Sequence, residues 1–275
     1  MNEFLKRSLT GIIFVAIILA GTIIHPLIFP VVFLAFLVFT QYEFYKLTEK
    51  AGYKPQALLG SVLGGLFFVI CNLAVQKIIP HRYCFLVFTV LIVIFLSEVL
   101  LKKINTLQNS MLTLGGFIYV VIPFSLLNFI VYPGFPDDNR FNPHILIGIF
   151  IIVWMYDSMA YAGGTLFGKH KIFKTISPKK SWEGLIIGAI FAVMAGIMNA
   201  VIFQSMTIFN WIVSAIIIVA FGTIGDLFES KIKRDLNIKD SGTILPGHGG
   251  FLDRFDSLLF AIPVVYIWLI LGGNI

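Results

Sequence analysis

Charged residues are scarce in this sequence. Asp, Glu, Lys and Arg make up 12% of the 275 residues, whereas an ordinary soluble domain carries about 25%. Hydrophobic residues make up 58%, and the mean hydropathy is +0.94, so an ordinary soluble protein is excluded. The two cysteines, Cys71 and Cys84, both lie in apolar stretches, which argues against a disulfide framework or a zinc site. The sequence also lacks a fixed-period repeat and a low-complexity tract.

Apolar stretches of about 18 residues or more recur along nearly the whole chain, which predicts transmembrane helices. We therefore expect an all-α, polytopic integral membrane protein with about nine spans. Residues 1–140 are expected to form N-terminal membrane helices for anchoring, lipid entry or dimer contacts, and residues 141–275 a catalytic membrane region with the motif loops. The expected spans are Leu9–Ile24, Leu27–Thr40, Ala57–Val75, Tyr83–Leu101, Leu112–Val131, His144–Phe167, Gly184–Phe203, Ile208–Phe228 and Leu258–Leu271.

The first, second and ninth of these spans are the least regular. The first follows Lys6 and Arg7, as the apolar part of a signal peptide does. A second apolar run follows at once and no small-residue cleavage site stands out, so we expect the first span to be retained. The second and ninth are shorter than the roughly 20 residues of a straight span. They contain Pro30 and Pro263, so we expect them to be kinked or to lean on neighbouring helices.

The Lys and Arg residues outside these spans are distributed unevenly. When the N-terminus, the loops and the C-terminus are assigned alternately to two sides, seventeen fall on one side and three on the other. Because positive charge is retained on the cytoplasmic face, the N-terminus is predicted to be inside and the C-terminus outside. The segments Gly168–Glu183 and Glu229–Asp256 then both lie in the cytoplasm. We expect a protein of the cell (inner) membrane whose active site faces the cytoplasm.

A first group of notable residues lies on the sixth expected span. Its members are Trp154, Asp157, Tyr161, Gly164 and Gly168. They are spaced by three or four residues and therefore share one helical face. Glycines let another helix or a ligand come close, and an ionised carboxylate near the bilayer centre costs about 2.5–3.5 kcal/mol, so Asp157 should face protein or a polar cavity. The alternative is a stripe that only packs helices, with the aspartate protonated or paired with a lysine.

A second group precedes the seventh span, where residues 177–184 read Ser-Pro-Lys-Lys-Ser-Trp-Glu-Gly. Ser181 followed by Glu183 is typical of a helix start, and helix N-termini attract phosphate through free N–H groups and the helix dipole. Lys179 and Lys180 add mobile positive charges that suit phosphate. The alternative is a basic loop that reflects membrane topology alone.

A third group lies where the eighth span leaves the membrane and the ninth enters it. Asp226, Glu229 and Lys233 share one helical face, and Asp253 and Asp256 are one turn apart. Paired carboxylates from two helix ends suit Mg²⁺, which keeps several waters and uses oxygens of substrate phosphates. A solvated charged face is the alternative, but it fits poorly because these carboxylates lie where the chain enters the membrane.

Basic residues and glycines surround these carboxylates. The interspersed Lys and Arg side chains can neutralise a triphosphate, and Gly247, Gly249 and Gly250 free the backbone to approach it. Two further carboxylates, Glu43 after the second span and Glu98 near the end of the fourth, have no assigned role. The residues by themselves therefore predict a site for phosphate and metal at the cytoplasmic face.

At this third group the sequence resembles the phosphatidate cytidylyltransferase, or CDP-diglyceride synthetase, family. The family's C-terminal motif is matched between residues 230 and 256 by Ser230, Lys233-Arg234, Lys239-Asp240, Pro246, His248-Gly249-Gly250 and Asp253-Arg254-Phe255-Asp256. The Trp-x-x-Asp pattern at Trp154 and the 177–184 segment also match, with Ser181 where the family usually has threonine. The resemblance runs from about Trp154 to Asp256, and the first 140 residues match only in being hydrophobic spans.

The resemblance implies that a phosphate oxygen of phosphatidic acid attacks the α-phosphorus of CTP in line, which yields CDP-diacylglycerol and pyrophosphate. It implies Mg²⁺ as the cofactor, with a second cation as a natural arrangement. The implied metal ligands are Asp226 and Asp253, with Asp256 near them. The implied phosphate contacts are Lys233, Arg234, Lys239 and Arg254, flanked by Ser177, Lys179 and Lys180. The other expected substrate contacts are Asp157, Tyr161, Glu183, Glu229, Ser230, Asp240, Gly249 and Gly250.

His248 is a candidate general base, phosphate donor or turn residue. We favour a phosphate or nucleotide contact, because the attacking lipid phosphate is already ionised near neutral pH. The expected partners are CTP, phosphatidic acid and the lipid bilayer, with no nucleic acid. A homodimer is what the family suggests.

Three other functions fit part of the pattern. A CTP-dependent polyprenol kinase would use the same nucleotide but transfer its γ-phosphoryl group and release CDP. A CDP-alcohol phosphotransferase fits less well, because no closely spaced Asp-Gly…Ala-Arg…Gly…Asp array lies on one span. A phosphate or cation transporter would explain carboxylates in the membrane, but transporters often place such residues at the midplane between repeats.

Overall fold

Helices make up most of the structure, which confirms the all-α, polytopic architecture. The computed structural model describes residues 3–101, 105–137, 140–173, 175–242, 244–245 and 249–275. Within these residues, eight helices are long and apolar enough to cross a membrane, and a shorter apolar helical stretch covers Leu9–Ile23. The chain divides into a first unit, Met1–Phe141 with Leu236–Phe255, and a second unit, Asn142–Asp235 with Asp256–Ile275.

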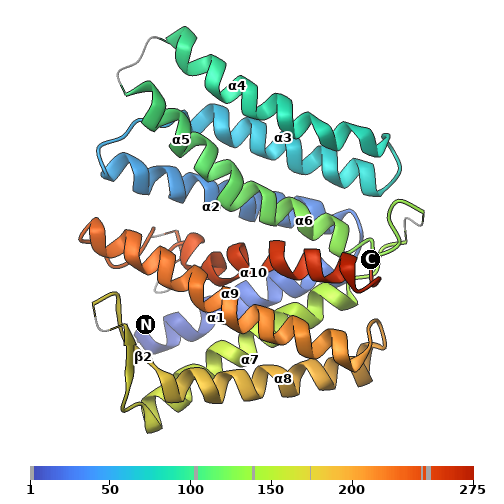
Figure 1. The fold of residues 1–275 in the computed structure, drawn as a ribbon, viewed down its shortest axis with the longest axis vertical. Coiled ribbons are helices and arrows are strands. Elements are labelled where there is room, and N and C mark those ends of the chain that lie inside the picture. The colour runs from blue at the N-terminus through green and yellow to red at the C-terminus, as the bar shows by residue number, and fades with distance from the viewer. Residues whose placement is uncertain (1–2, 102–104, 138–139, 174, 243, 246–248) are drawn as a thin grey trace. The chain divides into compact units, whose positions relative to one another are not determined.

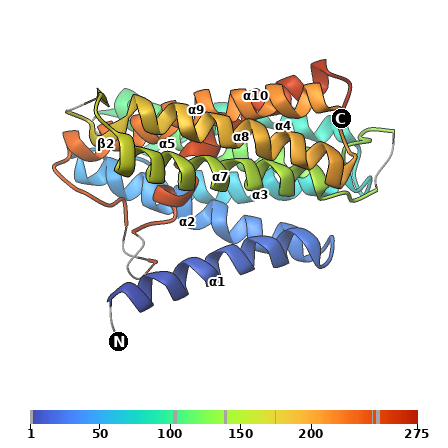
Figure 2. The ribbon, with the colours of Figure 1, turned by 90° about the horizontal axis from the view of Figure 1, so that it is seen from below.

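The first unit contains the N-terminal helices (Figure 1). Helix α2 contacts α1 and α3, and α3 contacts both α4 and α6. In Figure 2, α1 lies at the edge of the unit, next to α2. The elements are α1 (Glu3–Ile23), α2 (Ile28–Lys50), α3 (Ala57–Val75), the 3₁₀ turn η1 (His81–Phe85), α4 (Leu86–Leu101), α5 (Thr106–Gly116), the π-helical turn η2 (Phe117–Val121) and α6 (Ile122–Ile130).

An aromatic cluster ties the Leu236–Phe255 segment to the helices of the first unit. The ring of Phe255 lies 5.8 Å from that of Phe14 on α1, 5.4 Å from Phe36 on α2 and 5.0 Å from Phe124 on α6. Phe251 lies 5.6 Å from Phe36 and stacks on Phe39 at 5.0 Å. Such pairs contribute about 0.5–1.5 kcal/mol each beyond the burial of their area. Three helices therefore hold the end of the motif segment.

The second unit is built on α7 (His144–Phe167), α8 (Trp182–Phe203) and α9 (Ile208–Asp235), with the C-terminal helix α10 (Leu252–Leu271). Helix α10 begins in the first unit and continues as part of the second from Asp256 onward. Helix α8 lies beside both α7 and α9 (Figure 1). The basic segment between α7 and α8, expected as a loop, forms a two-stranded antiparallel ribbon of β1 (Lys171–Phe173) and β2 (Ser177–Ser181).

Small residues bring α7 and α8 close together. A Cβ atom added to Gly184 would lie 2.6 Å from the carbonyl oxygen of Ala160, and one added to Gly188 would lie 2.8 Å from the Ala160 side chain. On α7, added Cβ atoms at Gly164 and Gly168 would lie 3.2 and 2.7 Å from Ser181 Oγ. The glycines of the α7 stripe therefore serve a close helix contact, one of the two uses expected for them.

Several helices extend beyond the apolar runs that predicted them, among them α2, α9 and α10. Helix α2 continues from Thr40 to Lys50, α9 continues from Phe228 to Asp235, and α10 begins at Leu252 instead of Leu258. Hydropathy ends a span at the first charged residues, but these charged turns remain helical because their side chains have partners within the protein. Basic residues in the last turns of α2 and α9 also interact favourably with the negative end of the helix dipole.

Candidate active site

Acidic residues from three helices gather in the second unit. Asp256 on α10 lies within electrostatic range of Asp226 on α9 and of Asp157 on α7, and Lys233 provides an opposing positive charge. Helices α9 and α10 touch at Gly225, where an added Cβ would lie 2.4 Å from the carbonyl oxygen of Asp256. The missing side chain therefore lets the helix that carries Asp226 approach the helix that carries Asp256.

Asp226 contacts residues of both the ribbon and its own helix. Its Oδ2 atom lies 2.6 Å from Lys180 Nζ, and its Oδ1 atom accepts a hydrogen bond of 3.1 Å from Ser230 Oγ. Both members of the ion pair are partly exposed, at 25% for the Lys180 side chain and 32% for the Asp226 side chain. Lys180 of the predicted basic segment thus pairs with Asp226, which lies 46 positions later in the sequence.

A second contact joins the ribbon to α9. Arg234 Nε donates a hydrogen bond of 3.3 Å to the carbonyl oxygen of Ile176, which directly precedes Ser177 on β2. Lys179 is exposed and Ser177 is half-buried on the same strand. The second group of predicted residues and the α9 part of the third therefore belong to one surface.

Glu229 is buried inside the second unit, and its expected substrate contact stays a prediction. It has no exposed area, and its Oε2 atom lies 2.5 Å from Lys233 Nζ, one turn further along α9. The Lys233 side chain is 13% exposed. Glu229 therefore holds a mostly buried ammonium group in a defined position.

The second unit contains two carboxylates, Asp226 and Asp256, of the kind that Mg²⁺ binds. Asp226 and Asp256 repel each other unless positive charge lies near them, and Mg²⁺ is usually bound by one or two carboxylates together with water and substrate phosphates. Among the described residues, no three His, Cys, Asp or Glu side chains form a group that could hold a metal by themselves. The remaining ligands would therefore be oxygens of water and of a bound phosphate.

Asp253 is embedded in the motif segment of the first unit. Its Oδ2 atom accepts hydrogen bonds from Ser241 N at 3.0 Å, Ser241 Oγ at 2.9 Å and Gly250 N at 2.8 Å. Gly249 has φ +79, and a Cβ there would lie 2.6 Å from the same oxygen, so a glycine is required for both reasons. Asp253 thus organises the glycine-rich segment, and Asp256 follows one turn later on α10.

The other motif residues of this segment include both exposed and buried positions. Lys239, Asp240 and Arg254 are exposed, and Gly250 is buried. His248 lies outside the described residues, so its expected phosphate contact stays a prediction.

The α7 residues divide between interior and surface. Trp154 stacks on Phe150 with ring centroids 5.6 Å apart, whereas Asp157 is exposed and Tyr161 has 73% of its surface exposed. Tyr156, which we had not singled out, is buried and its hydroxyl lies 2.5 Å from Thr223 Oγ1 on α9. No sequence pattern indicated this link between α7 and α9, because neither residue is charged or part of a motif.

Glu183 and Ser181 hold the start of α8 and the ribbon together. Ser181 Oγ accepts a hydrogen bond of 3.2 Å from Gly184 N, which confirms the expected helix cap. Glu183 lies 2.6 Å from His170 Nδ1 and accepts hydrogen bonds of 3.2 Å from the backbone N–H groups of Lys169 and His170. In this structure Glu183 thus closes the ribbon, while its expected substrate contact stays a prediction.

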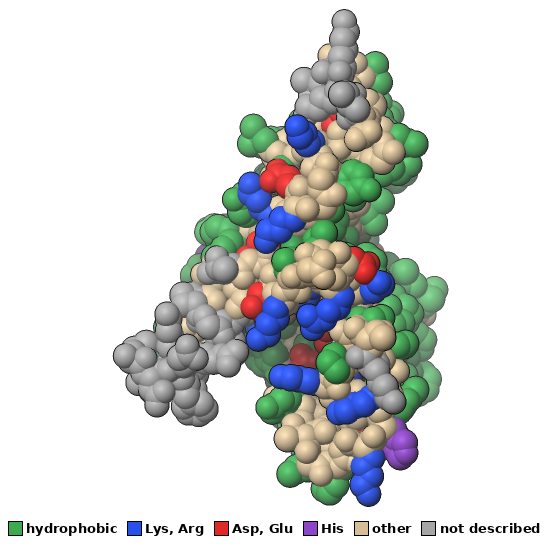
Figure 3. All heavy atoms as spheres, turned by 90° about the vertical axis from the view of Figure 1, so that its left-hand side faces the viewer, with side chains coloured by type: hydrophobic (Ala, Val, Ile, Leu, Met, Phe, Trp, Pro, Cys, Tyr) green, Lys and Arg blue, Asp and Glu red, His purple; other side chains and the backbone are tan. Residues whose placement is uncertain are grey.

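Exposed basic side chains of the second unit include Lys169, Lys179, Lys231 and Arg234. Figure 3 shows Lys and Arg side chains on one face of the molecule, with acidic side chains among them. Such a surface attracts a polyanion such as a nucleoside triphosphate.

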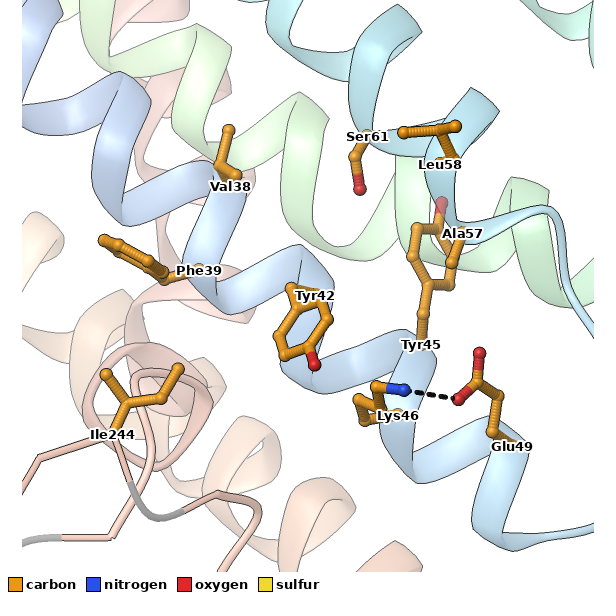
Figure 4. A pocket seen from close by; sticks show the side chains of 10 residues that line it. All are labelled: Val38, Phe39, Tyr42, Tyr45, Lys46, Glu49, Ala57, Leu58, Ser61 and Ile244. Atoms are coloured by element: carbon orange, nitrogen blue, oxygen red, sulfur yellow. Dashed lines mark hydrogen bonds and ion pairs between the residues drawn. The ribbon is translucent and has the colours of Figure 1, made fainter.

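A cavity of about 530 Å³ lies in the first unit (Figure 4). It is bounded by α2 and α3, with Ile244 of the motif segment at its edge. Its polar residues are mainly at one side, where Lys46 Nζ and Glu49 Oε2 form an ion pair of 3.0 Å. Among the described residues that line this cavity, none is predicted to act in catalysis or substrate binding.

Comparison of this sequence with those of known proteins identifies its family. A sequence model of the cytidylyltransferase family matches residues 5–271. The chain belongs to the cytidylyltransferase family. The match includes the N-terminal helices, so the resemblance is not confined to the region from Trp154 to Asp256, as the motifs had indicated. The matched residues belong to both units.

Individual members of the cytidylyltransferase family are also similar. Phosphatidate cytidylyltransferase of Staphylococcus saprophyticus is 37% identical over 182 residues, covering 64% of this chain and 69% of the relative. The enzymes of the same name from Staphylococcus aureus and Staphylococcus haemolyticus are each 36% identical, over 185 and 181 residues. These alignments cover 65% and 64% of this chain and 70% and 69% of the relatives.

Proposed function

We propose that this protein is a phosphatidate cytidylyltransferase, which converts CTP and phosphatidic acid to CDP-diacylglycerol and pyrophosphate. A non-bridging oxygen of the lipid phosphate attacks the α-phosphorus of CTP. A new phosphorus–oxygen bond forms, the bond from the α-phosphorus to the bridging oxygen of the β-phosphate breaks, and pyrophosphate leaves with that electron pair. The lipid phosphate is already ionised, so the step needs no general base.

The observation that carries this proposal is the meeting of Lys180, Asp226, Asp256 and Lys233 in one unit of a membrane protein. Catalysis of phosphoryl-type transfer depends mainly on positioning the reactants and neutralising their charge. Carboxylates that can bind a cation and ammonium groups that can bind phosphates serve both purposes. The names of the similar staphylococcal enzymes support the choice of CTP and phosphatidic acid among phosphate chemistries.

The basic residues of the second unit are already oriented by acidic partners. Lys180 is held by Asp226, and Lys233 is held by the buried Glu229. The Lys233 side chain therefore loses little conformational freedom when a triphosphate binds. Arg234 joins the ribbon to α9 and brings the exposed Lys179 to the same surface.

Asp226 and Asp256 are the residues of the second unit that would hold Mg²⁺, with Asp253 as a further ligand on the basis of family resemblance. A bound Mg²⁺ supplies neutralisation of the phosphate oxygens and polarisation of the α-phosphorus. Lys180 and the cation would compete for Asp226 Oδ2, so we expect Lys180 to turn to a phosphate group when the cation is present.

The cytoplasm is the expected location of this chemistry. The alternation of Lys and Arg supports a cytoplasmic N-terminus in the cell membrane, with the ribbon and the C-terminal end of α9 on the same side. CTP is available there, and phosphatidic acid reaches the site from the bilayer. A homodimer remains a prediction from the family.

The test is an assay of purified protein in lipid nanodiscs with phosphatidic acid, Mg²⁺ and CTP labelled at either the α- or the γ-phosphorus. We expect the α-label in the lipid product, the γ-label in pyrophosphate, equal amounts of the two products, and loss of both with a chelator. Transfer of the γ-label to a polyprenol with release of CDP would identify a kinase. Uptake of phosphate or cations into vesicles without any lipid product would identify a transporter.

Two aspartates of α9 form a matched pair for the same assay. Asp226→Asn removes a carboxylate from the acidic cluster, whereas Asp235→Asn removes an exposed carboxylate that pairs with Lys231. We expect the first variant to lose at least about 10²-fold in turnover, the scale of a lost group that stabilises transition-state charge. The second should retain activity, and equal losses would contradict the assignment.

A further inference from the structure

Glu43 is a buried carboxylate near the C-terminal end of α2, without a role in the proposed chemistry. Only 2% of its surface is exposed. A buried charge is costly unless it is paired and hydrogen-bonded, so its contacts should reveal why it is there. Its Oε2 atom accepts hydrogen bonds of 2.9 Å from Leu252 N and 3.2 Å from Ser241 Oγ.

These contacts connect α2 to the motif segment of the same unit. Leu252 is the first residue of α10, so Glu43 places a carboxylate at the positive end of that helix. This position is usually filled by a side chain from the residue just before a helix. Here the carboxylate comes from a residue 209 positions earlier, so the start of α10 is anchored to a different helix.

The motif segment is shaped to enclose this carboxylate. A Cβ atom added to Gly242 would lie 2.2 Å from Glu43 Oε1, and one added to Gly250 would lie 2.1 Å from Glu43 Oε2. Two glycines on either side of the short loop thus leave room for the two carboxylate oxygens. A chance contact with one atom would not require a missing side chain at both positions.

Ser241 links Glu43 to Asp253. Its hydroxyl lies 3.2 Å from Glu43 Oε2 and 2.9 Å from Asp253 Oδ2, and its backbone N–H donates to the same Asp253 oxygen at 3.0 Å. Gly250 N completes the set on Asp253 at 2.8 Å. A displacement of Glu43 would therefore change both the start of α10 and the partners of Asp253.

We propose that Glu43 is a positioning residue, which holds Ser241 and Leu252 and thereby sets the place of Asp253 for the reaction; the catalytic part of this inference rests on the proposed function. Four glycines lie between Lys239 and Asp253, and such a segment has high conformational entropy when it is not anchored. The rigid helix α2 supplies the anchor, and Glu43 is its point of attachment.

The test compares Glu43→Gln with Glu49→Gln in the full-length protein in nanodiscs. Glu43→Gln keeps the size of the side chain but removes the charge, whereas Glu49 is 40% exposed and pairs with Lys46 on the same helix. Hydrogen–deuterium exchange is measured without metal or nucleotide. We expect peptides covering residues 239–255 to exchange about tenfold faster or more in Glu43→Gln, because charge-assisted hydrogen bonds are about twice as strong as neutral ones.

The same variants are then compared in the cytidylyltransferase assay. Loss of positioning should raise the Mg²⁺ and CTP concentrations for half-maximal rate about tenfold in Glu43→Gln and leave them unchanged in Glu49→Gln. A purely structural role would reduce the maximal rate without a change in those concentrations. That result, or faster exchange spread equally over α2, α3 and α6, would overturn the proposal.

Ser241→Ala provides a second route if Glu43→Gln does not fold. It removes the hydroxyl between the two carboxylates and leaves the contact between Glu43 and Leu252 N in place. We expect faster exchange in residues 239–255 and a raised Mg²⁺ requirement, and wild-type behaviour in both measurements would overturn the link. If the wild-type protein makes no CDP-diacylglycerol, the proposed function fails, while the exchange results still decide whether Glu43 anchors the segment.

Discussion

The contact of α9 with α10 at Gly225 allows a sharp test of the acidic site. In Gly225→Ala the new Cβ would lie 2.4 Å from the carbonyl oxygen of Asp256, whereas a close carbon–oxygen contact is about 3.3 Å. The helices must therefore separate by about 0.9 Å to reach that distance. Overpacking of this kind costs about 1–3 kcal/mol, partly offset by the roughly 1 kcal/mol higher helix propensity of alanine.

The expected effect on activity is larger than the effect on stability. Asp226 follows Gly225 directly, and Asp256 carries the carbonyl that is pushed away, so the two carboxylates move relative to each other. A misplacement of about 1 Å in a catalytic arrangement can cost about 10²-fold in rate. We therefore expect Gly225→Ala to remain folded, with a melting temperature lowered by a few degrees, and to lose about two orders of magnitude in CDP-diacylglycerol formation.

Gly222→Ala is the matched control on the same helix. Its Cβ would lie 3.5 Å from Ser257 Cβ, an ordinary contact distance, so we expect near-wild-type activity and equal or higher stability. Initial rates with α-labelled CTP and thermal unfolding followed by circular dichroism measure the two quantities. Full activity of Gly225→Ala, or an equal loss in Gly222→Ala, would refute the role of this helix contact.

Two further substitutions test the motif segment and the α8 cap. Asp253→Asn should remain folded in detergent and lose turnover, because the amide has no charge for a cation; retained activity at saturating Mg²⁺ would remove Asp253 from the metal site. Ser181→Ala removes the acceptor of Gly184 N at 3.2 Å and should cost about 1 kcal/mol, or about 2–4 °C in melting temperature. Thr165→Ala, which removes a hydroxyl bonded only to a carbonyl of its own helix, is the control, and an equal shift in both would argue against the cap.

Hydropathy located most of the helices because it reports a local property. The expected bounds of α3 and α7 agree with the structure at both ends. The ends of α2, α9 and α10 were wrong, since each helix continues through charged turns. In α2 one of those charged residues, Glu43, is almost completely buried, which no average over neighbouring residues could indicate.

Motif spacing predicted the acidic and basic residues of the candidate site but not their contacts with one another. The pairing of the buried Glu229 with Lys233, for example, was not among the predictions. The pairing of Lys180 with Asp226 could not be read from spacing either, because it depends on how α8, α9 and the ribbon lie against one another.

The sequence by itself determined that this is a membrane protein with a cytidylyltransferase motif. Both conclusions depend on residues that are near each other in the chain: long apolar runs, and fixed intervals between carboxylates, glycines and basic residues. Only the tertiary structure decided that Glu43 anchors the start of α10 and that Tyr156 meets Thr223. The physical reason is that hydrogen bonds form between atoms within about 3 Å, and packing can bring such atoms together from residues that are 209 positions apart.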